Sequence, residues 1–412
     1  MSMSKLVSLL TYVSANNAFY KGVMATQGIT DALDISQYPI FSRKQLQENR
    51  YKMFSNGYLA KYNTMALRRH STSGSSGIPV NVYWDYPDYH RSMLTLWRRR
   101  AQYYGIRPND KSVNIEFTTL DSTLGSEKIL YKPNEHMMQI AASQLLTESN
   151  IIKAMDAIDD FAPTWICAQP SALRKLINGY KKCNRSASKG LRYIEMVGEA
   201  LTPDIQTQSQ QFFGVPVVNL YASQEVNGIA YECPHHRLHV LDDNVLVECL
   251  TPKGIATTGY GEAIITSLHN KAMPIIRYNQ GDMITLLGVD GEQCVCGCTA
   301  QVIESIHGRA RDYLLLGGVE IGTDLLGRLI ADVNNEYDDP ILEYSFVYAV
   351  GKNKITCTIA IDNTRKHWGT KVAEALTNTF YARVPNIVSF SVVMSDVYQA
   401  TSAKHKVWEV RD

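Results

Sequence analysis

The chain has 412 residues, of which 45% are hydrophobic and 20% charged, and this length favours two or more domains over a single core. Its formal net charge of +1 excludes the strong positive field that attracts nucleic acid or an anionic membrane. No apolar segment approaches the roughly 20 residues of a membrane-spanning helix, so we expect a cytoplasmic protein without nucleic-acid or membrane partners.

The first part of the chain is predicted to be helical. Residues 1–65 carry apolar residues at helical spacing around a polar loop at Asp34–Tyr38. The spacing of apolar residues over 86–105 predicts another helix. We therefore expect helices before and after the segment at 70–84.

Hydroxyl groups and glycines are concentrated in His70–Pro79, just before the apolar stretch Val80–Trp84. Glycines let backbone N–H groups approach an anion, and hydroxyls add donors, so the segment predicts a phosphate-binding loop. It lacks the lysine and the spacing of the common P-loop, and a flexible Gly/Ser linker is the alternative. The candidate phosphate-binding residues are Ser71, Thr72, Ser73, Gly74, Ser75, Ser76 and Gly77.

The middle of the chain alternates strands and helices, which indicates a parallel sheet with crossover helices. Ligands of such sheets collect at the carboxyl ends of strands, where Gly198-Glu199 and Tyr221–Glu225 lie. The predicted elements in order are a helix at 151–160, a strand at 165–168, a helix at 172–182, a strand at 193–197, a helix at 204–213 and a strand at 215–220.

The last part of the chain contains two regions with different predicted secondary structure. Short strands punctuated by Gly and Asp, over 246–250, 263–267, 284–287 and 301–306, predict a β-rich subdomain. After Asp312 the order helix (324–333), strand (343–350), strand (354–361), helix (371–381) and strand (388–394) predicts a small α+β domain.

Five motifs occur in the order found in adenylate-forming enzymes, and within them the phenylacetate–CoA ligase and coenzyme F390 synthetase-like branch. They are the loop at 70–79, Gly198-Glu199-Ala200, Tyr221-Ala222-Ser223-Gln224-Glu225, Arg277-Tyr278-Asn279-Gln280-Gly281-Asp282 and Gly308-Arg309-Ala310-Arg311-Asp312. The chain resembles this family over nearly its whole length. The family's loop usually carries a lysine before the proline, where this chain has Ile78.

This resemblance implies an α/β fold. It consists of a large N-terminal ATP- and acid-binding domain, residues 1–310, with parallel sheets and the β-rich subdomain. A small α+β lid, residues 311–412, follows and is hinged near Arg311. Relatives are often dimers, so the resemblance also implies a homodimer.

The resemblance assigns a role to each motif. Glu225 is expected to hold Mg²⁺, which prefers oxygen ligands, with a carboxylate at a helix N-terminus as the alternative. Asp282, in a tight turn after Gly281, is expected to accept the ribose hydroxyls, with a simple inter-strand turn as the alternative. Tyr221 is expected to stack on adenine. The other expected nucleotide-binding residues are Gly198, Glu199, Ala222, Ser223 and Arg309; a surface salt bridge is the alternative for Arg309.

Lys404 lies in Thr401-Ser402-Ala403-Lys404 and matches the family's C-terminal lysine, which bridges the carboxylate and the phosphate. A compact positive charge suits developing negative charge. A solvated tail is the alternative, and Lys406 is the neighbouring candidate for the role.

Soft ligands occur in two local groups, Cys233–His239 and Cys294–Cys298. Each lies on a predicted tight turn, and such a pair of groups suits tetrahedral zinc. The phenylacetate–CoA ligase-like branch frequently carries Cys…Leu-His-Val and a later Cys-x-Cys-Gly-Arg, and this chain matches with Leu238-His239-Val240 and Cys294-Val295-Cys296-Gly297, with Cys298 in place of the arginine. The resemblance therefore implies that Cys233, His239, Cys294 and Cys296 form a structural zinc site with no open position. Cys298 and His235 are spare candidates, and reduced core thiols with exposed histidines are the alternative.

The expected activity is ATP-dependent ligation of a carboxylic acid, most simply an aryl acid. An acyl-AMP forms with Mg²⁺, and CoA then takes the acyl group as a thioester. An amide-forming ligase of natural-product or polysaccharide biosynthesis, which uses an amine acceptor, is one alternative. A non-catalytic nucleotide-binding homologue is another.

Overall fold

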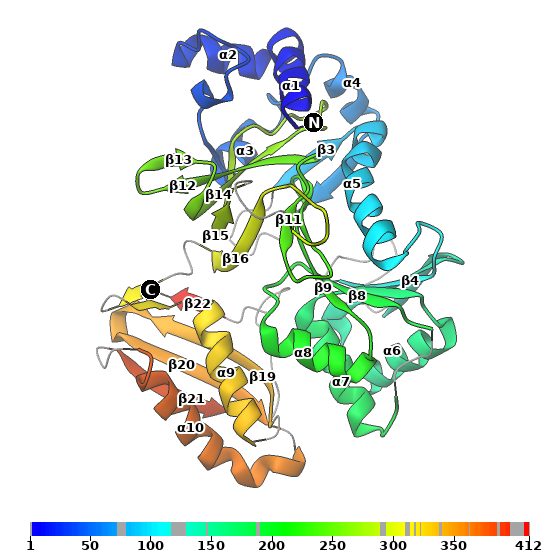
Figure 1. Ribbon diagram of the computed structural model, residues 1–412, viewed down its shortest axis with the longest axis vertical. Helices are drawn as coiled ribbons and strands as arrows, with labels where there is room; N and C mark the ends of the chain where they lie inside the picture. The colour runs from blue at the N-terminus through cyan, green and yellow to red at the C-terminus, as the bar shows by residue number, and fades with distance from the viewer. Residues whose placement is uncertain are drawn as a thin grey trace. The chain divides into compact units, whose positions relative to one another are not determined.

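The computed structural model describes residues 2–71, 80–116, 129–145, 147–186, 190–288, 294–309, 314–316, 319–321, 323–337, 340–361, 363–384, 388–395 and 408–411 (Figure 1). The chain forms two compact units, each built from two separate stretches. The first combines Met1–Pro108 with Val218–Ile306, and the second combines Asn109–Val217 with His307–Asp412. None of the helices in the described ranges is long and apolar enough to cross a membrane.

The first unit begins with helices that cover part of its core. Leu6, Leu9, Leu10 and Val13 are buried along one face of the first helix, as their helical spacing requires. The elements are α1 (Ser2–Asn16), α2 (Ala18–Gln27), β1 (Phe41–Ser42), α3 (Arg43–Asn49), α4 (Tyr58–Asn63), β2 (Arg68–Ser71), β3 (Asn81–Trp84) and α5 (Tyr86–Tyr104), with a 3₁₀ turn at Ile35–Gln37.

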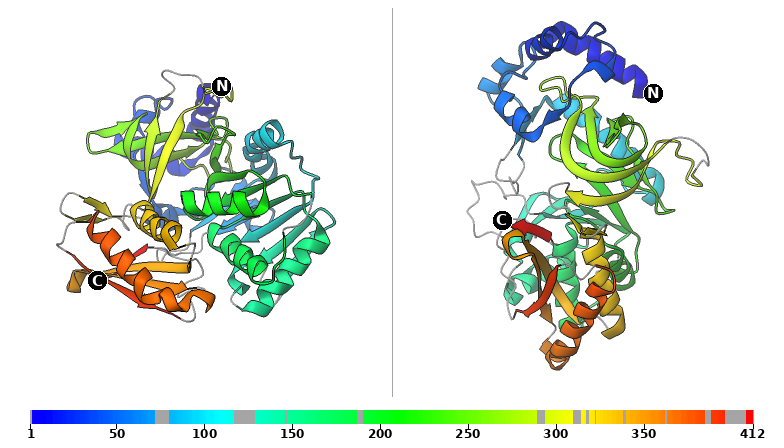
Figure 2. Two further views of the ribbon diagram at one scale, coloured as in Figure 1. Left: turned by 60° about the horizontal axis from the view of Figure 1, so that its bottom comes forward. Right: turned by 90° about the vertical axis from the view of Figure 1, so that its left-hand side faces the viewer.

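The rest of the first unit is a curved, mainly antiparallel sheet (Figure 2), which confirms the predicted β-rich region. The strand order is β13-β12-β14-β15-β16-β11-β10-β9, and β1 pairs in parallel with β15. The strands are β9 (Val217–Ser223), β10 (Asn227–Glu232), β11 (Leu238–Val240), β12 (Val245–Thr251), β13 (Gly254–Ala256), β14 (Gly259–Ser267), β15 (Tyr278–Leu287) and β16 (Val302–Arg309).

The second unit contains the predicted parallel sheet, because β4 pairs in parallel with both β6 and β7, and β7 with β8. Apolar residues of these strands form one core with the three helices α6–α8, which gather beside the sheet in Figure 1. The elements are β4 (Ser112–Glu116), β5 (Leu130–Asn134), β6 (Met137–Ala141), α6 (Glu148–Phe161), β7 (Trp165–Ala168), α7 (Pro170–Lys182), β8 (Tyr193–Val197) and α8 (Pro203–Phe213), with a 3₁₀ turn at Ala142–Gln144.

The C-terminal stretch of this unit is a separate small α+β layer with the strand order β21-β20-β19-β22. Helices α9 and α10 pack on its strands and form a core of their own with them. The elements are β17 (Leu314–Leu316), β18 (Val319–Ile321), α9 (Thr323–Tyr337), β19 (Ile341–Ala349), β20 (Lys354–Ile361), α10 (Gly369–Tyr381), β21 (Ser389–Met394) and β22 (Trp408–Arg411), with 3₁₀ turns at Val350–Lys352 and Asn363–Trp368.

This α+β layer contacts the parallel-sheet part of the same unit. The guanidinium carbon of Arg174, on α7, lies 4.9 Å from the ring centre of Tyr344 on β19. A Cβ added at Gly327 on α9 would come within 2.8 Å of Cγ2 of Thr202, so only glycine fits there without a shift. The contact therefore depends on a small residue in α9.

Candidate functional site

Glu225 lies in the turn between the antiparallel strands β9 and β10, where Asn227 pairs with Ser223. The alternative of a helix N-terminal carboxylate is therefore wrong. Its side chain is only 3% exposed, and its Oε1 accepts a hydrogen bond of 2.9 Å from the hydroxyl of Tyr278. The turn thus holds a nearly buried carboxylate in a defined orientation at the end of a strand.

Arg43 brings a positive charge to this carboxylate, with its Nη1 3.7 Å from Oε1 of Glu225. A capping box formed by Ser42 and Gln45 begins α3 and places Arg43 in its first turn. Pairing of Ser42 with Asn279 then fixes the start of this helix beside β15. Arg43 was not among the predicted site residues. The Ser-x-x-Gln pattern signals the helix start, but no local pattern reveals the distant carboxylate.

Asp282 lies within the ten-residue strand β15, so the tight turn predicted around it is wrong. Glu262 of β14 pairs with Met283, whereas Ile264 pairs with Asn279. Because β15 has more residues between these two pairs than β14 has, the strand bulges there. Bulges re-aim side chains, and this one contains Asp282 and Gly281, whose φ is +83°.

The hydroxyl of Tyr221, on β9, donates to Oδ2 of Asp282 over 2.7 Å. The amide Nε2 of Gln280 donates to the same Oδ2 over 2.9 Å and also to the Tyr221 hydroxyl. Exposed fractions are 9%, 5% and 8% for Tyr221, Gln280 and Asp282. Two of the predicted nucleotide-binding residues, Tyr221 and Asp282, therefore lie in direct contact. They are joined by Gln280, which was not predicted to be part of the site.

The phosphate loop is described only at its stem. Ser71 ends β2 and its hydroxyl donates to Asn81 Oδ1 on β3, whereas Thr72–Gly77 lie outside the described residues. Nδ1 of His70 lies 3.3 Å from the backbone oxygen of Gln224, so the stem lies beside the turn that carries Glu225. Burial, and then the nearby Arg68, lower the pKa of His70 to about 4.

The remaining predicted nucleotide-binding residues lie at several places. In the second unit, Gly198 follows β8 with φ +85°, and the carboxylate of Glu199 accepts hydrogen bonds from the backbone N–H and the hydroxyl of Ser171, at the start of α7. Arg309 is the last residue of β16, and Lys404 and Lys406 lie outside the described residues.

Ala222 and Ser223 end β9 in the first unit. The hydroxyl of Ser223 is buried and has no hydrogen-bond partner within the described ranges. A buried polar group without a partner costs free energy, so this hydroxyl is suited to a ligand that accepts from it or donates to it.

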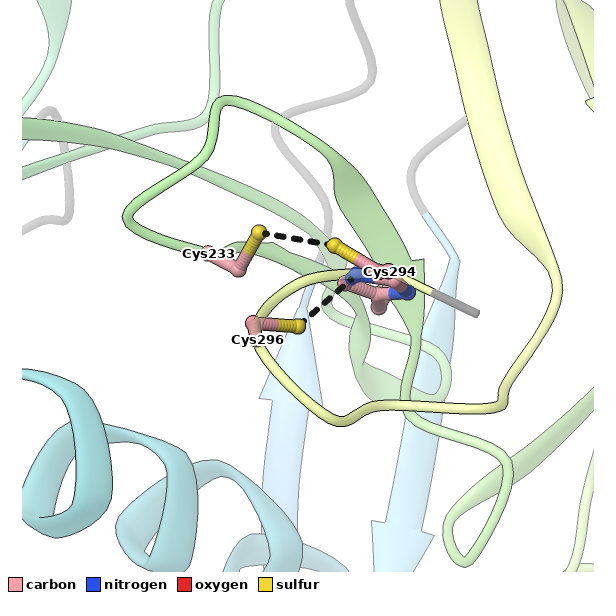
Figure 3. Close-up of side chains that lie close together, drawn as sticks. Cys233, Cys294 and Cys296 are labelled. Carbon is pink, nitrogen blue, oxygen red and sulfur yellow. Dashed lines mark hydrogen bonds between the residues drawn. The ribbon is translucent and has the colours of Figure 1, made fainter. Parts of the chain in front are cut away.

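The four expected metal ligands, Cys233, His239, Cys294 and Cys296, lie together, each ligand atom within 4.8 Å of the others. The Sγ atoms of Cys233 and Cys294 are 3.8 Å apart (Figure 3). Sγ of Cys296 is 3.3 Å from Nε2 of His239. Cys233 follows β10, His239 lies on β11, and the two later cysteines precede β16. Local turns and sheet pairing thus gather two cysteine groups that are far apart in the sequence.

Burial of this cluster shifts the pKa values of two of its residues. Desolvation raises the pKa of the Cys233 thiol to about 12 and lowers the pKa of His239. Helix α5 contributes two further contacts. The Tyr103 hydroxyl donates to Sγ of Cys296, and Arg99 Nη2 donates to Sγ of Cys298 over 3.0 Å. The spare candidate Cys298 is therefore held by Arg99, outside the group of four.

No protein-family model matches the chain. It is 26% identical to the phenylacetate–coenzyme A ligase of Thermus thermophilus over 334 residues, which is 77% of this chain and 71% of that enzyme. It is 23% identical to the Escherichia coli phenylacetate–coenzyme A ligase over 298 residues, 70% of this chain and 64% of that enzyme. The match to the Escherichia coli enzyme thus spans less than two thirds of that protein.

Among solved structures, the chain is similar to 2-hydroxyisobutyryl-CoA ligase in the postadenylation state, in complex with 2-HIB-AMP. The TM-score is 0.79 and the sequence identity 15%, with 100% of this chain and 88% of that chain covered. This similarity establishes the fold. The chain is therefore a homologue of phenylacetate–coenzyme A ligases and has the fold of the adenylate-forming acyl-CoA ligases.

Proposed function

We propose that this protein is an ATP-dependent carboxylic acid ligase that forms an acyl-AMP and then transfers the acyl group to CoA. The observation that carries the proposal is the placement of Glu225 and Asp282. Both are nearly buried carboxylates, oriented by the tyrosines Tyr278 and Tyr221 within one unit. Homology to phenylacetate–coenzyme A ligases supports this reaction class and makes an aryl acid the first substrate to test.

The nucleotide would be bound by groups on β9, β15 and the phosphate loop. Glu225 would hold Mg²⁺, which screens the negative charge of the phosphates. Asp282 would accept the ribose hydroxyls, and Tyr221 would contact adenine. The hydroxyl of Ser223, which has no partner among the residues that the structure describes, would hydrogen-bond the nucleotide. Residues 71–77 would surround the phosphates, and Ala222 lies on β9 beside Tyr221. Gly198, Glu199 and Arg309 stay predicted nucleotide-binding residues, supported by the motifs in which they occur.

The loop has Ile78 where the family that it resembles usually has lysine. Arg43 offers a replacement for that charge, because its guanidinium already lies 3.7 Å from the carboxylate assigned to Mg²⁺. An arginine presents several N–H donors to phosphate oxygens in a fixed geometry. We therefore assign Arg43 to the departing phosphates.

In the first step a carboxylate oxygen of the acid attacks the α-phosphorus of ATP, and the bond to the β-phosphate bridging oxygen breaks, so pyrophosphate leaves. Lys404 would neutralise the charge shared by the carboxylate and the α-phosphate, and the lid of residues 311–412 would carry it. In the second step the thiolate of CoA attacks the acyl carbon and AMP leaves. Orientation and electrostatic stabilisation supply the catalysis.

The group Cys233, His239, Cys294 and Cys296 would hold a structural Zn²⁺. Three sulfurs and one imidazole nitrogen in mutual proximity are a set of donors that zinc prefers, and four protein ligands leave no position for substrate. The metal would join β10 and β11 to the segment that precedes β16. Its role would be to stabilise the first unit.

ATP–pyrophosphate exchange on the purified protein, with a panel of aryl and short acyl acids, tests the proposal. Exchange that depends on one acid would establish adenylation and identify that acid. Addition of CoA or of amines would then show whether a thioester or an amide forms. A protein that binds ATP but exchanges with no acid in the panel would contradict the proposed reaction and favour a non-catalytic nucleotide-binding role.

A further inference from the structure

A closed triangle of hydrogen bonds joins Gln280, Tyr221 and Asp282. The Tyr221 hydroxyl donates to Oδ2 of Asp282 over 2.7 Å, and Nε2 of Gln280 donates to both the tyrosine oxygen and Oδ2. The two amide hydrogens of Gln280 and the one hydroxyl hydrogen of Tyr221 supply all three bonds. A carboxylate has no hydrogen to give, so only this orientation of the amide satisfies the triangle.

The bulge in β15 makes this triangle possible. Gln280 and Asp282 are two residues apart and point to the same side of the strand. The pairing shifts between Glu262 and Ile264, so this part of β15 forms the bulge. Both side chains are more than 90% buried. A hydrogen bond to a charged group in such a site is stronger than one in water, and leaving its acceptor unpaired is costly.

We propose that Gln280 is a positioning residue for recognition of the nucleotide ribose, through its bridge between Tyr221 and Asp282. This inference rests on the proposed function, in which Asp282 accepts the ribose hydroxyls. In this role Gln280 acts through the two residues that it bridges. It holds the Asp282 carboxylate and the Tyr221 ring in one arrangement before the ligand arrives, so that binding does not have to order them.

The test compares ATP with 2′,3′-dideoxy-ATP, which lacks both ribose hydroxyls, by measuring the Kd of each in the presence of Mg²⁺. The wild-type protein is expected to bind ATP at least about tenfold more tightly than 2′,3′-dideoxy-ATP. In the dideoxy complex the charged Asp282 carboxylate receives no hydrogen bonds from ribose hydroxyls. In Gln280→Leu this preference is expected to fall several-fold, mainly through weaker binding of ATP. A general loss of structure would weaken the binding of both nucleotides equally and leave the ratio of their Kd values unchanged.

Gln280→Glu gives a second readout. It replaces the amide donor with a carboxylate that faces Asp282, so the ATP preference is expected to be lost at pH 8. Lowering the pH lets the two carboxylates share a proton, which restores one hydrogen bond of the triangle. The preference should therefore recover in part as the pH falls towards 5.5, relative to the wild type at the same pH. Gln211→Glu, on an exposed position of α8, is the matched charge control and should behave like the wild type.

The outcomes separate the two proposals. A wild-type protein that binds ATP and 2′,3′-dideoxy-ATP equally, or binds neither, overturns the role of Asp282 and the inference with it. A wild-type protein that prefers ATP, with Gln280→Leu and Gln280→Glu showing the same preference at every pH, overturns the role of Gln280 alone. A loss of the preference in Gln280→Leu with pH-dependent recovery in Gln280→Glu supports both.

Discussion

The hydroxyl of Tyr278 donates a hydrogen bond to Oε1 of Glu225 over 2.9 Å, and so joins the first residue of β15 to the turn between β9 and β10. Tyr278 is fully buried and Glu225 nearly so. A carboxylate in such a place needs donors, since burial removes its water. Because the contact fixes one oxygen of Glu225, the carboxylate has a defined orientation in the folded chain.

Replacement of Tyr278 by phenylalanine removes this donor and keeps the aromatic ring. We expect the Mg²⁺ concentration at half-maximal pyrophosphate exchange to change several-fold, because the carboxylate loses its fixed orientation. The check is a Mg²⁺ titration at saturating ATP and acid. Tyr348→Phe, in the small α+β layer, is the control for loss of a tyrosine hydroxyl. An unchanged Mg²⁺ dependence in Tyr278→Phe would show that the hydroxyl does not position Glu225.

Arg43→Ala is expected to slow pyrophosphate exchange by at least about tenfold, since it removes the charge that we assign to the departing phosphates. The adjacent Lys44 is the matched control, because its side chain is 74% exposed and contacts Glu48 on the same helix. Lys44→Ala should change the rate less than twofold if exposed ion pairs of this kind contribute little. Equal rates for the two variants would refute the phosphate role of Arg43.

The cluster of Cys233, His239, Cys294 and Cys296 should contain about one zinc ion per chain by elemental analysis. Cys296→Ser should lose the metal and lower Tm, whereas Cys183→Ser, at an exposed cysteine outside the cluster, should retain both. A protein that contains no metal, and whose Tm a strong chelator leaves unchanged, would exclude the site.

Zinc retention should also depend on pH. Burial raises the pKa of the Cys233 thiol to about 12, so without metal this sulfur is protonated at neutral pH, and zinc binding must release the proton. The affinity for zinc should therefore fall as the pH falls. Competition with a chelator at several pH values measures this slope, and a flat profile would mean that no thiol loses a proton.

The buried ion pair between Arg277 and Glu248 should be important for stability. Arg277 contacts both carboxylate oxygens and also donates to the backbone oxygens of Ser36 and Tyr38, with its side chain 6% exposed. Arg277→Met leaves Glu248 buried without its partner and should cost about 3–5 kcal/mol of unfolding free energy. Arg411→Met breaks an exposed pair with Glu409 and should cost about 0.5 kcal/mol or less. Urea denaturation of both variants measures their unfolding free energies. Equal losses in the two variants would show that burial of the ion pair does not increase its contribution.

Much of the architecture could be predicted because it depends on local patterns. The spacing of apolar residues placed α1 and α5, and alternation of strand and helix predicted the parallel sheet of β7 and β8. The expected cysteine and histidine ligands were selected by two short groups that match motifs of the family that the chain resembles, and the structure brings these groups together. In each case neighbouring residues carry the signal.

The failures share one cause. The turn expected around Asp282 is a bulge within a long strand, and the register of β14 against β15 decides this. The helix N-terminus considered for Glu225 is a hairpin turn, because β10 returns beside β9. Strand pairing joins residues that are distant in the sequence, so local propensity could not decide either case.

By itself the sequence determined which chemical groups the protein possesses and in what order. These are a loop rich in glycine and hydroxyl groups, carboxylates after strands, and soft ligands in two short groups. Only the tertiary structure decided that Arg43 faces Glu225 and that Gln280 bridges Tyr221 and Asp282. These contacts arise because packing buries polar side chains from separate strands and helices, and the buried carboxylates of Glu225 and Asp282 are paired there with groups from other parts of the chain.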